Sequence, residues 1–260
     1  MKKLISLALV VLLAVSLLSI SVFAETEEAN VFVTISDGEG KLVMTYAPVE
    51  LRDLDGDGAL TINDTLIAAH ESVGKADAYV SSESAWGLSI TKLWGDESGN
   101  YGYFVNDSSA MSLTDAVKAG DHIKAFIYTD SVTWSDIYCF FDRHDVSAEK
   151  GDEMILTLCG YAYDENWNRI VVPVSGAKIL IDGEETGVMT DANGKAIVTI
   201  EKSGDLVISA DSDGQILVPP VCLVHAEGGS ALLVISIVAV VILVACMAVV
   251  LVKKFKNDAK

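Results

Sequence analysis

Apolar and polar residues alternate in short segments along the middle of the chain, which predicts β-strands. Residues 31–37 and 41–51 alternate on both sides of a glycine-containing turn at 38–40 and predict a β-hairpin. Further strand-like segments follow at 87–95, 100–107, 122–130 and 134–142.

One segment follows a helical period instead. Within residues 61–72, apolar side chains recur at the spacing of one helix face. Thr61 is a good N-cap residue, and the acidic Asp64 follows three positions later, as in a capping box. Several strands with one packed helix predict an α+β domain with a mixed sheet over residues 25–145.

Residues 146–226 consist of short apolar segments separated by Asp, Asn and Gly, with no helical period. Short strands at regular intervals are typical of a small β-sandwich, so we expect an all-β Ig-like domain here. The polar stretch 144–152 is the expected domain boundary, and residues 227–230 form a short linker.

The two ends of the chain predict membrane-related segments. Residues 1–24 combine a basic start, a long apolar run and a small residue at Ala24, which predicts a secretory signal peptide; an uncleaved anchor is the alternative. Residues 231–252 carry no charge and are long enough for a transmembrane helix, and lysines follow directly. The positive-inside rule then predicts a single-pass protein of the cell membrane, with the tail 253–260 in the cytoplasm and the preceding domains extracytoplasmic.

Charge separates the middle of the chain from its ends. The whole chain has 18 basic and 37 acidic residues. Six of the basic residues, all lysines, and one of the acidic residues, an aspartate, lie in the end segments. The middle of the chain therefore has 12 basic and 36 acidic residues and a net charge of −24. Such a surface repels phosphate backbones and excludes nucleic acid as a partner, whereas metal cations and cationic partners fit it.

Residues 53–64 match a calcium-binding loop, with acidic side chains at loop positions 1, 3, 5 and 12 and glycine at position 6. Ca²⁺ takes about six to eight oxygen ligands, and this spacing wraps a short chain around one ion. The alternative is an acidic turn that binds nothing, in which the aspartates repel one another. The expected ligands are the side chains of Asp53, Asp55, Asp57 and Asp64, the carbonyl of Ala59, and Thr61 through a water molecule.

This loop resembles the calcium-binding half-repeat of dockerins, which has the form DxDGDGxLTxxD. A dockerin has two such repeats, whereas we find one here, with Asp at position 12 and no helix before the loop. The resemblance implies calcium as a bound cofactor, and the single repeat argues against docking to a cohesin.

A second resemblance covers the first domain. Segments 61–71, 86–94, 101–106 and 120–128 are similar to those of transcobalamin-like domains, which are related to the cobalamin-binding domain of intrinsic factor. Bacterial surface proteins often join such a domain to a dockerin-like loop and Ig-like repeats. The second domain resembles carboxypeptidase-regulatory or bacterial Ig-like modules, which act as spacers.

The transcobalamin-like resemblance implies a ligand site near Trp94, Tyr101, Tyr103 and Asn106. We add Trp134 as a further candidate for ligand binding. The alternative interpretation is that these aromatic side chains pack in the core of the domain.

No nucleophile elbow, HExxH motif, phosphate loop or paired-cysteine motif occurs in the sequence, so we expect no enzymatic activity. The four histidines have no partner at a recognisable spacing, and we interpret each as an ordinary surface or helix-end residue. Three cysteines lie outside the expected membrane segment. Either Cys159 and Cys222 form a disulfide or the three are free thiols.

Together these features predict a non-enzymatic, membrane-anchored bacterial surface protein that binds or displays a partner and has one structural calcium site. The partner class is a small molecule or another surface protein. The alternative is a capture protein that passes a corrinoid or another small molecule to an uptake transporter.

Overall fold

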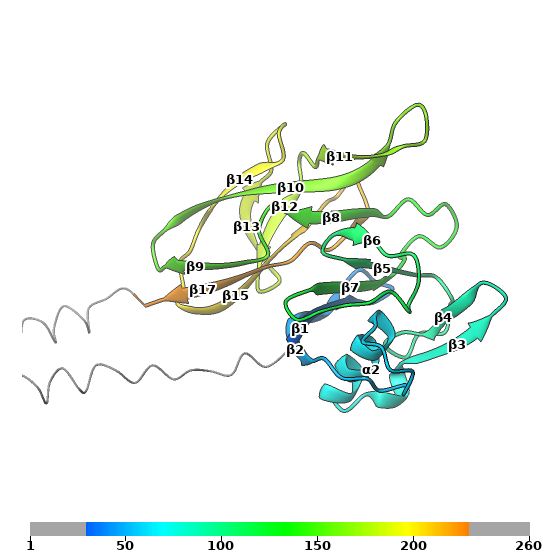
Figure 1. The fold of residues 1–260 in the computed structure, drawn as a ribbon. Helices are drawn as coiled ribbons and strands as arrows, with labels where there is room; N and C mark the ends of the chain where they lie inside the picture. Colours follow the sequence, from blue (N-terminus) through cyan, green and yellow to red (C-terminus); the bar gives the residue numbers. More distant parts are fainter. Residues whose placement is uncertain (1–29, 229–260) are drawn as a thin grey trace, which may run out of the picture.

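A computed structural model describes residues 30–228, which form two β-rich lobes (Figure 1). The N-terminal lobe consists of β1 (Asn30–Ser36), β2 (Leu42–Glu50), α2 (Ile62–Ser72), the 3-10 helix η1 (Ala76–Ala78), β3 (Val80–Ser84), β4 (Gly87–Lys92), β5 (Tyr101–Val105), β6 (Ser108–Ser109) and β7 (His122–Ile127). The C-terminal lobe consists of β8 (Ile137–Phe141), β9 (Asp145–Glu149), β10 (Glu153–Tyr163), β11 (Arg169–Pro173), β12 (Lys178–Ile181), β13 (Glu184–Met189), β14 (Lys195–Thr199), β15 (Gly204–Asp211), β16 (Leu217–Val218) and β17 (Cys222–Glu227).

The N-terminal lobe is built on a five-stranded sheet in the order β2-β1-β7-β5-β6. β1 and β7 are parallel, and the other pairs are antiparallel. The predicted hairpin is confirmed as β1 and β2, and its turn is closed by a hydrogen bond of 2.9 Å from the Asp37 N–H to the Lys41 carbonyl. β3 and β4 form a separate two-stranded hairpin.

Helix α2 begins where the sequence predicts it, after the N-cap residue Thr61. Its apolar face includes Ile62, Leu66 and Ala69, which are fully buried in the same core cluster as β1 and β7. Burying one large apolar side chain stabilises a fold by about 1.5–3 kcal/mol. The helix is therefore fixed by packing on one face of the sheet as well as by its cap (Figure 1).

Strand β7 is buried on both faces. Because side chains alternate along a strand, Ile123 and Ala125 join the core beneath α2. Lys124 and Phe126 point the other way and contact the C-terminal lobe. The second face of the N-terminal sheet is thus covered by the other lobe.

The C-terminal lobe contains two further sheets, in the orders β11-β10-β8-β16 and β13-β12-β15-β17-β9, and β14 also pairs with β10. They enclose one apolar core, so the expectation that this segment is all-β is confirmed. The sequence placed residues 134–142 in the first domain. Instead, β8 pairs with β10 and with β16, so this segment belongs to the second lobe.

The predicted fold class, an α+β domain followed by an Ig-like sandwich and a transmembrane helix, is wrong. The described residues are mostly β, with one α-helix of 11 residues. The physical reason is that α2 covers one face of a single sheet, whereas the opposite face packs against strands of the C-terminal lobe. The helix is present where it is predicted, but it is a small part of a mostly β fold.

No helix within residues 30–228 is both long enough and apolar enough to cross a membrane. The predicted signal peptide at 1–24 and the predicted transmembrane helix at 231–252 with its tail lie outside the described residues.

Candidate functional site

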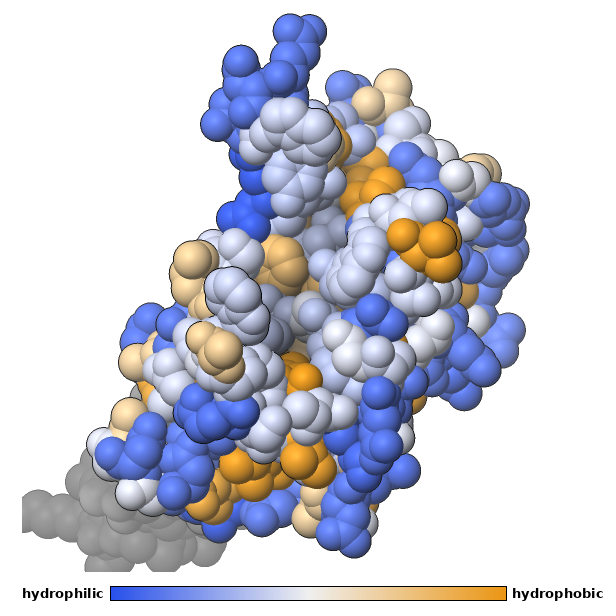
Figure 2. Space-filling view, turned by 90° about the vertical axis from the view of Figure 1, so that its right-hand side faces the viewer, coloured by the Kyte–Doolittle hydropathy of each residue, from blue (hydrophilic) through white to orange (hydrophobic). Residues whose placement is uncertain are grey.

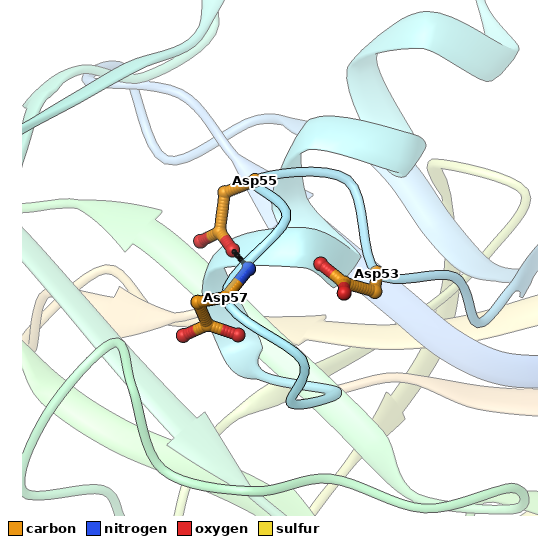
Figure 3. Close-up of side chains that lie close together, drawn as sticks. All are labelled: Asp53, Asp55 and Asp57. Carbon is orange, nitrogen blue, oxygen red and sulfur yellow. Dashed lines mark hydrogen bonds between the residues drawn. The ribbon is translucent and has the colours of Figure 1, made fainter.

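Three acidic side chains come together on the loop that leads into α2. The carboxylates of Asp53, Asp55 and Asp57 each offer an oxygen that lies within 4.8 Å of the others, and all three residues are exposed. Figure 3 shows Asp53 on one side of the loop and Asp55 and Asp57 on the other. These are three of the six predicted calcium ligands.

Asp53 also shapes the backbone of this loop. Its Oδ1 accepts a hydrogen bond of 2.7 Å from the Gly56 N–H, and its Oδ2 accepts one of 3.0 Å from the Gly58 N–H. Gly58 adopts a φ of +85°, in the left-handed region that a residue with a Cβ rarely enters. Gly58 is the glycine at position 6 of the calcium-loop pattern, and its conformation permits the sharp bend.

Asp64 and Thr61, two other predicted ligands, are occupied by the helix cap. The Thr61 side chain accepts from the Asp64 N–H, and the Asp64 carboxylate accepts from the Thr61 N–H and hydroxyl, at 3.0 and 2.7 Å. The second oxygen of Asp64 accepts from the Leu54 N–H at 2.7 Å. The carboxylate is therefore turned to the helix cap and the loop backbone, and it is not part of the cluster formed by Asp53, Asp55 and Asp57.

Burial by itself raises the pKa of the Asp64 carboxyl, but hydrogen bonds from Thr61 and the loop backbone outweigh it and hold the pKa below its ordinary value. Asp64 is therefore ionised at neutral pH. Its charge stabilises the N-terminal end of α2, because the helix dipole favours an anion there.

Asn63 links the acidic loop to the rest of the lobe, which the sequence analysis did not foresee. Its amide nitrogen donates to Asp55 Oδ2 at 2.9 Å, and its carbonyl oxygen accepts from the Tyr79 hydroxyl at 2.9 Å. Asn63 is buried at the start of α2. A polar residue in the first turn of a helix indicates that Asn63 has hydrogen-bond partners. The sequence does not identify them, because Asp55 precedes α2 and Tyr79 follows it.

The geometry of the three carboxylates fits one Ca²⁺ ion. Two oxygens bound to the same ion at about 2.3–2.6 Å can be at most about 5 Å apart, which agrees with the separation of 4.8 Å or less. The neighbouring basic residue Arg52 pairs instead with Glu50 and Glu71. A divalent cation would therefore relieve the repulsion among the three carboxylates.

Three residues of the predicted small-molecule site pack against the apolar core that α2 helps to form. The backbone N–H of Trp94 donates to His70 Nε2 at 3.3 Å, and the Tyr101 hydroxyl donates to the Asp96 backbone carbonyl at 2.7 Å. Trp94, Tyr101 and Tyr103 are partly buried and pack against the apolar core of the N-terminal lobe. These contacts support the alternative interpretation, in which the residues belong to the core.

The other two predicted ligand residues lie elsewhere. Asn106 is in the β5–β6 turn, where its side chain bonds to the Asp121 carboxylate and to the His122 N–H, both at 2.9 Å. Trp134 lies in the β7–β8 loop with its ring 4.7 Å from that of Tyr128. The five residues therefore do not form one site.

A groove of about 600 Å³ lies between the two lobes. None of the five predicted ligand residues lines it. The polar residues that do include Glu39, Lys41 and Thr129 of the N-terminal lobe and Asp182, Asp211 and Gln215 of the C-terminal lobe.

A buried ionisable cluster joins the lobes. Asp107, in the β5–β6 turn, accepts a hydrogen bond of 2.7 Å from the Tyr138 hydroxyl on β8, and it lies 2.9 Å from His144 Nε2. The Tyr161 hydroxyl donates to the Asp107 backbone carbonyl. Three side chains of the C-terminal lobe thus converge on one residue of the N-terminal lobe.

Lys124 makes a second polar contact between the lobes. Its Nζ donates to the Cys139 carbonyl at 2.8 Å and lies 4.5 Å from the centre of the Tyr138 ring. Burial lowers the pKa of the Lys124 ammonium to about 8. Removing water from an ammonium group disfavours its charged form, which explains the direction.

The two histidines of this region differ in charge. A hydrogen bond to Asp107 raises the pKa of His144, whereas burial lowers the pKa of His122 to about 3. Burial raises the pKa of the Asp107 carboxyl, but the hydrogen bonds to His144 and Tyr138 and the charges of His144 and Lys124 together outweigh it and leave that pKa below its ordinary value. The pair is therefore an imidazolium and a carboxylate in weakly acidic solution.

The sequence interpretation of the histidines as ordinary surface or helix-end residues is wrong for His122, which is 4 % exposed, whereas His70 lies in the last turn of α2 as expected but is fully buried. His122 Nε2 lies 2.9 Å from the Thr34 hydroxyl oxygen. The partner is on another strand, so no local spacing reveals it. Cys139, Cys159 and Cys222 are free thiols, so the alternative of a Cys159–Cys222 disulfide is wrong.

Comparison with known proteins finds no matching family model and no matching curated protein. Among solved structures, the D0-D1 domain of intimin is similar at a TM-score of 0.28 and 15% identity, over 75% of this chain and 97% of that chain. The ectodomain of a teleost fish polymeric Ig receptor is similar at a TM-score of 0.19 and 10% identity, over 58% of this chain and 73% of that chain. Neither is described as a dockerin or a transcobalamin, and similarity at this level assigns no function.

Proposed function

We propose that this chain is a non-enzymatic binding protein whose N-terminal lobe is stabilised by one Ca²⁺ ion. The observation that carries the proposal is the convergence of Asp53, Asp55 and Asp57 within 4.8 Å of one another, directly before α2. Carboxylate oxygens are hard ligands that Ca²⁺ prefers. Asp64 supports the site without being a ligand, because its carboxylate accepts from the Leu54 N–H of the loop and from the Thr61 N–H of the helix cap.

The ion connects to the fold through one short path. Asp55 bonds to Asn63, and Asn63 bonds to the buried Tyr79. Binding at the loop therefore restrains the first turn of α2 and the segment that follows it. A site of this kind is structural, since it fixes the scaffold from which other surfaces bind a partner.

Capture of a corrinoid gains no support from the described residues, because the five predicted ligand residues do not converge, and we do not propose it. The resemblance to dockerin loops and transcobalamin-like domains remains a prediction from the sequence. The same holds for an extracytoplasmic location and a membrane partner, which depend on residues 1–24 and 231–260.

Calcium is expected to raise the thermal stability of the full chain, and EDTA is expected to lower it. If Ca²⁺ binds the folded form alone, free calcium at 100 times its Kd stabilises that form by about 2.7 kcal/mol. Calorimetric titration and thermal unfolding with Ca²⁺, Mg²⁺ or EDTA measure the effect. Mg²⁺ should substitute poorly, because it demands a smaller octahedral site.

A matched pair of variants separates the site from general charge effects. Asp57→Asn removes one carboxylate of the cluster while retaining an oxygen that can accept from the Ala59 N–H, as Asp57 does. Asp191→Asn removes the same charge from an exposed turn of the C-terminal lobe, where Asp191 accepts similar backbone bonds. The proposal requires that Asp57→Asn abolish the calcium response and Asp191→Asn preserve it. An unchanged melting curve of the unmodified chain with EDTA would contradict it.

A further inference from the structure

Three of the four tryptophans are exposed on loops. Trp86 lies in the β3–β4 turn and is 96% exposed, and Trp167 lies in the β10–β11 turn and is 83% exposed. Trp134, in the β7–β8 loop, is 51% exposed. Large aromatic side chains that remain in water in the free protein are enriched in surfaces that bind a partner.

The three loops project from the same end of the molecule. Figure 1 shows the β3–β4, β7–β8 and β10–β11 connections at the end opposite to the one where the described chain leaves β17. Figure 2 looks onto this end and shows a surface that is hollowed near its centre. We call the surface formed by these three loops the tryptophan end.

The backbone conformation of two of these tryptophans is a second, independent indication of a functional position. Trp134 has a φ of +56° and Trp167 a φ of +61°. This left-handed region favours glycine and asparagine, and a bulky residue there is strained. Strain without compensating burial is typical of functional positions. Trp167 has little burial to offset its strain.

Charge indicates the kind of partner. The three loops contain Asp130, Asp136, Asp164 and Glu165, and Glu83 lies at the end of β3 beside the β3–β4 turn. These loops contain no basic residue, and the nearest one in the sequence, Arg169 at the start of β11, already lies with its guanidinium 4.4 Å from the centre of the Tyr161 ring. Exposed indole rings beside carboxylates suit Lys and Arg side chains, which stack on the rings and pair with the acidic groups.

We propose that the tryptophan end binds a basic polypeptide segment, with Trp86 and Trp167 as its main anchors. This inference rests on the proposed function as a binding protein and adds the class of partner. Since a few aromatic anchors carry most of the energy of an interface, the two most exposed tryptophans should dominate the affinity.

Binding is tested on the full chain with a nonaarginine peptide as the probe, by calorimetry at about physiological salt, where long-range charge attraction is reduced. Trp86→Ala/Trp167→Ala is expected to weaken binding by about 30-fold or more, the effect of losing one anchor or more. The matched control, Ile155→Ala/Ile197→Ala, removes two exposed apolar side chains that pair across β10 and β14 on the C-terminal lobe. It should bind as tightly as the unmodified chain.

Three outcomes would overturn the inference: no binding of nonaarginine, equal loss in both double variants, or tryptophan-dependent binding to phosphatidylcholine vesicles in place of the peptide. The calcium response is measured in the same samples. If it persists while peptide binding fails, the tryptophan end is wrong and the calcium proposal stands. If it is absent while peptide binding follows the tryptophans, the calcium proposal is the one that fails.

Discussion

Replacing Asp107 by Gly is expected to lower the free energy of unfolding by about 3–5 kcal/mol, the effect of removing one partner from a buried charged pair. The sequence preferences of the turn alone predict the opposite, a gain in stability. Asn106 and Asp107 both have positive φ, +48° and +57°, and Asn-Gly is a preferred sequence for such a two-residue turn. The loss arises because Tyr138 and His144 would be left without the carboxylate at the lobe interface. Urea unfolding at pH 6 measures it.

Asp107→Asn is the matched control for this result. Asparagine tolerates the left-handed conformation and can still accept from the Tyr138 hydroxyl. It cannot balance a protonated His144, so its effect should lie between those of the unmodified chain and Asp107→Gly. An Asp107→Gly variant as stable as the unmodified chain would show that the lobes are not held together here.

The same pair should make stability depend on pH. Because the folded pKa of His144 is raised, its contribution is complete below about pH 6.5 and is lost as pH rises through that folded pKa. Because the folded pKa of Asp107 is lowered, its contribution is present above about pH 3.9 and is lost as pH falls through that folded pKa. The stability difference between the unmodified chain and Asp107→Asn should therefore be largest between about pH 4 and 6.5 and decrease on the alkaline side.

Other ionisable groups face this pair and change the stability of the unmodified chain with pH. Because the folded pKa of Lys124 is lowered to about 8, this group makes the protein more stable as pH rises from about 8 toward its unfolded pKa. Because the folded pKa of His122 is lowered to about 3, that group makes the protein more stable as pH rises from about 3 to about 6.5. Both groups are present in the unmodified chain and in Asp107→Asn. Because the Asp107 charge, against the larger effect of burial, also raises the pKa of His122 and of Lys124, Asp107→Asn changes these two groups as well. The difference between the two proteins from about pH 5 to 7.5 therefore reports the loss of the Asp107 charge on all three groups, of which His144 is the one in direct contact with it. A difference that grows toward pH 7.5 would contradict the assignment.

Replacing Phe126 by Ala is the second change with a large expected effect, a loss of about 3–5 kcal/mol. Phe126 is 1% exposed and packs with Tyr138 and Val218 of the other lobe. Its ring lies directly over Gly102 of the neighbouring strand, where an added Cβ would stand 2.2 Å from the ring. Chemical unfolding of the full chain measures the loss.

Two further variants test this packing. Phe126→Leu keeps part of the apolar volume and should lose less than Phe126→Ala. Gly102→Ala leaves the ring in place but forces it to move, so it should destabilise the fold by about 1–3 kcal/mol, as overpacking does. If Gly102→Ala unfolds at the same urea concentration as the unmodified chain, the close contact between Gly102 and Phe126 is incorrect.

Local patterns predicted the elements whose causes are local. The hairpin β1–β2 has its turn between its strands, and α2 has its cap at Thr61 and its apolar residues on one face, so both can be read from adjacent residues. The lobe boundary could not be read in this way. β8 has the same alternation as strands of the first lobe, and its partners β10 and β16 are set by tertiary packing.

The candidate sites show the same division. The spacing of Asp53, Asp55 and Asp57 places three carboxylates around one short loop, and their convergence follows from the sequence. Asp64 matches the ligand pattern equally well, yet its four hydrogen bonds go to the helix cap and the loop backbone. The residues that join the lobes, such as Lys124 and Tyr138, look like ordinary strand positions because their partners lie on separate strands.

The pairing of the last strands with the first strands of the C-terminal lobe has a consequence for synthesis. Leu217 pairs with Ile137, and Leu223 pairs with Asp145, so β16 and β17 close the two sheets that β8 and β9 open. While the intervening residues are added, on the order of ten seconds at ordinary translation rates, β8 and β9 have unpaired edges. Exposed strand edges template pairing with other chains. A nascent chain of this protein is therefore most prone to aggregation in that interval, and a holdase chaperone acting there would raise the yield of folded protein.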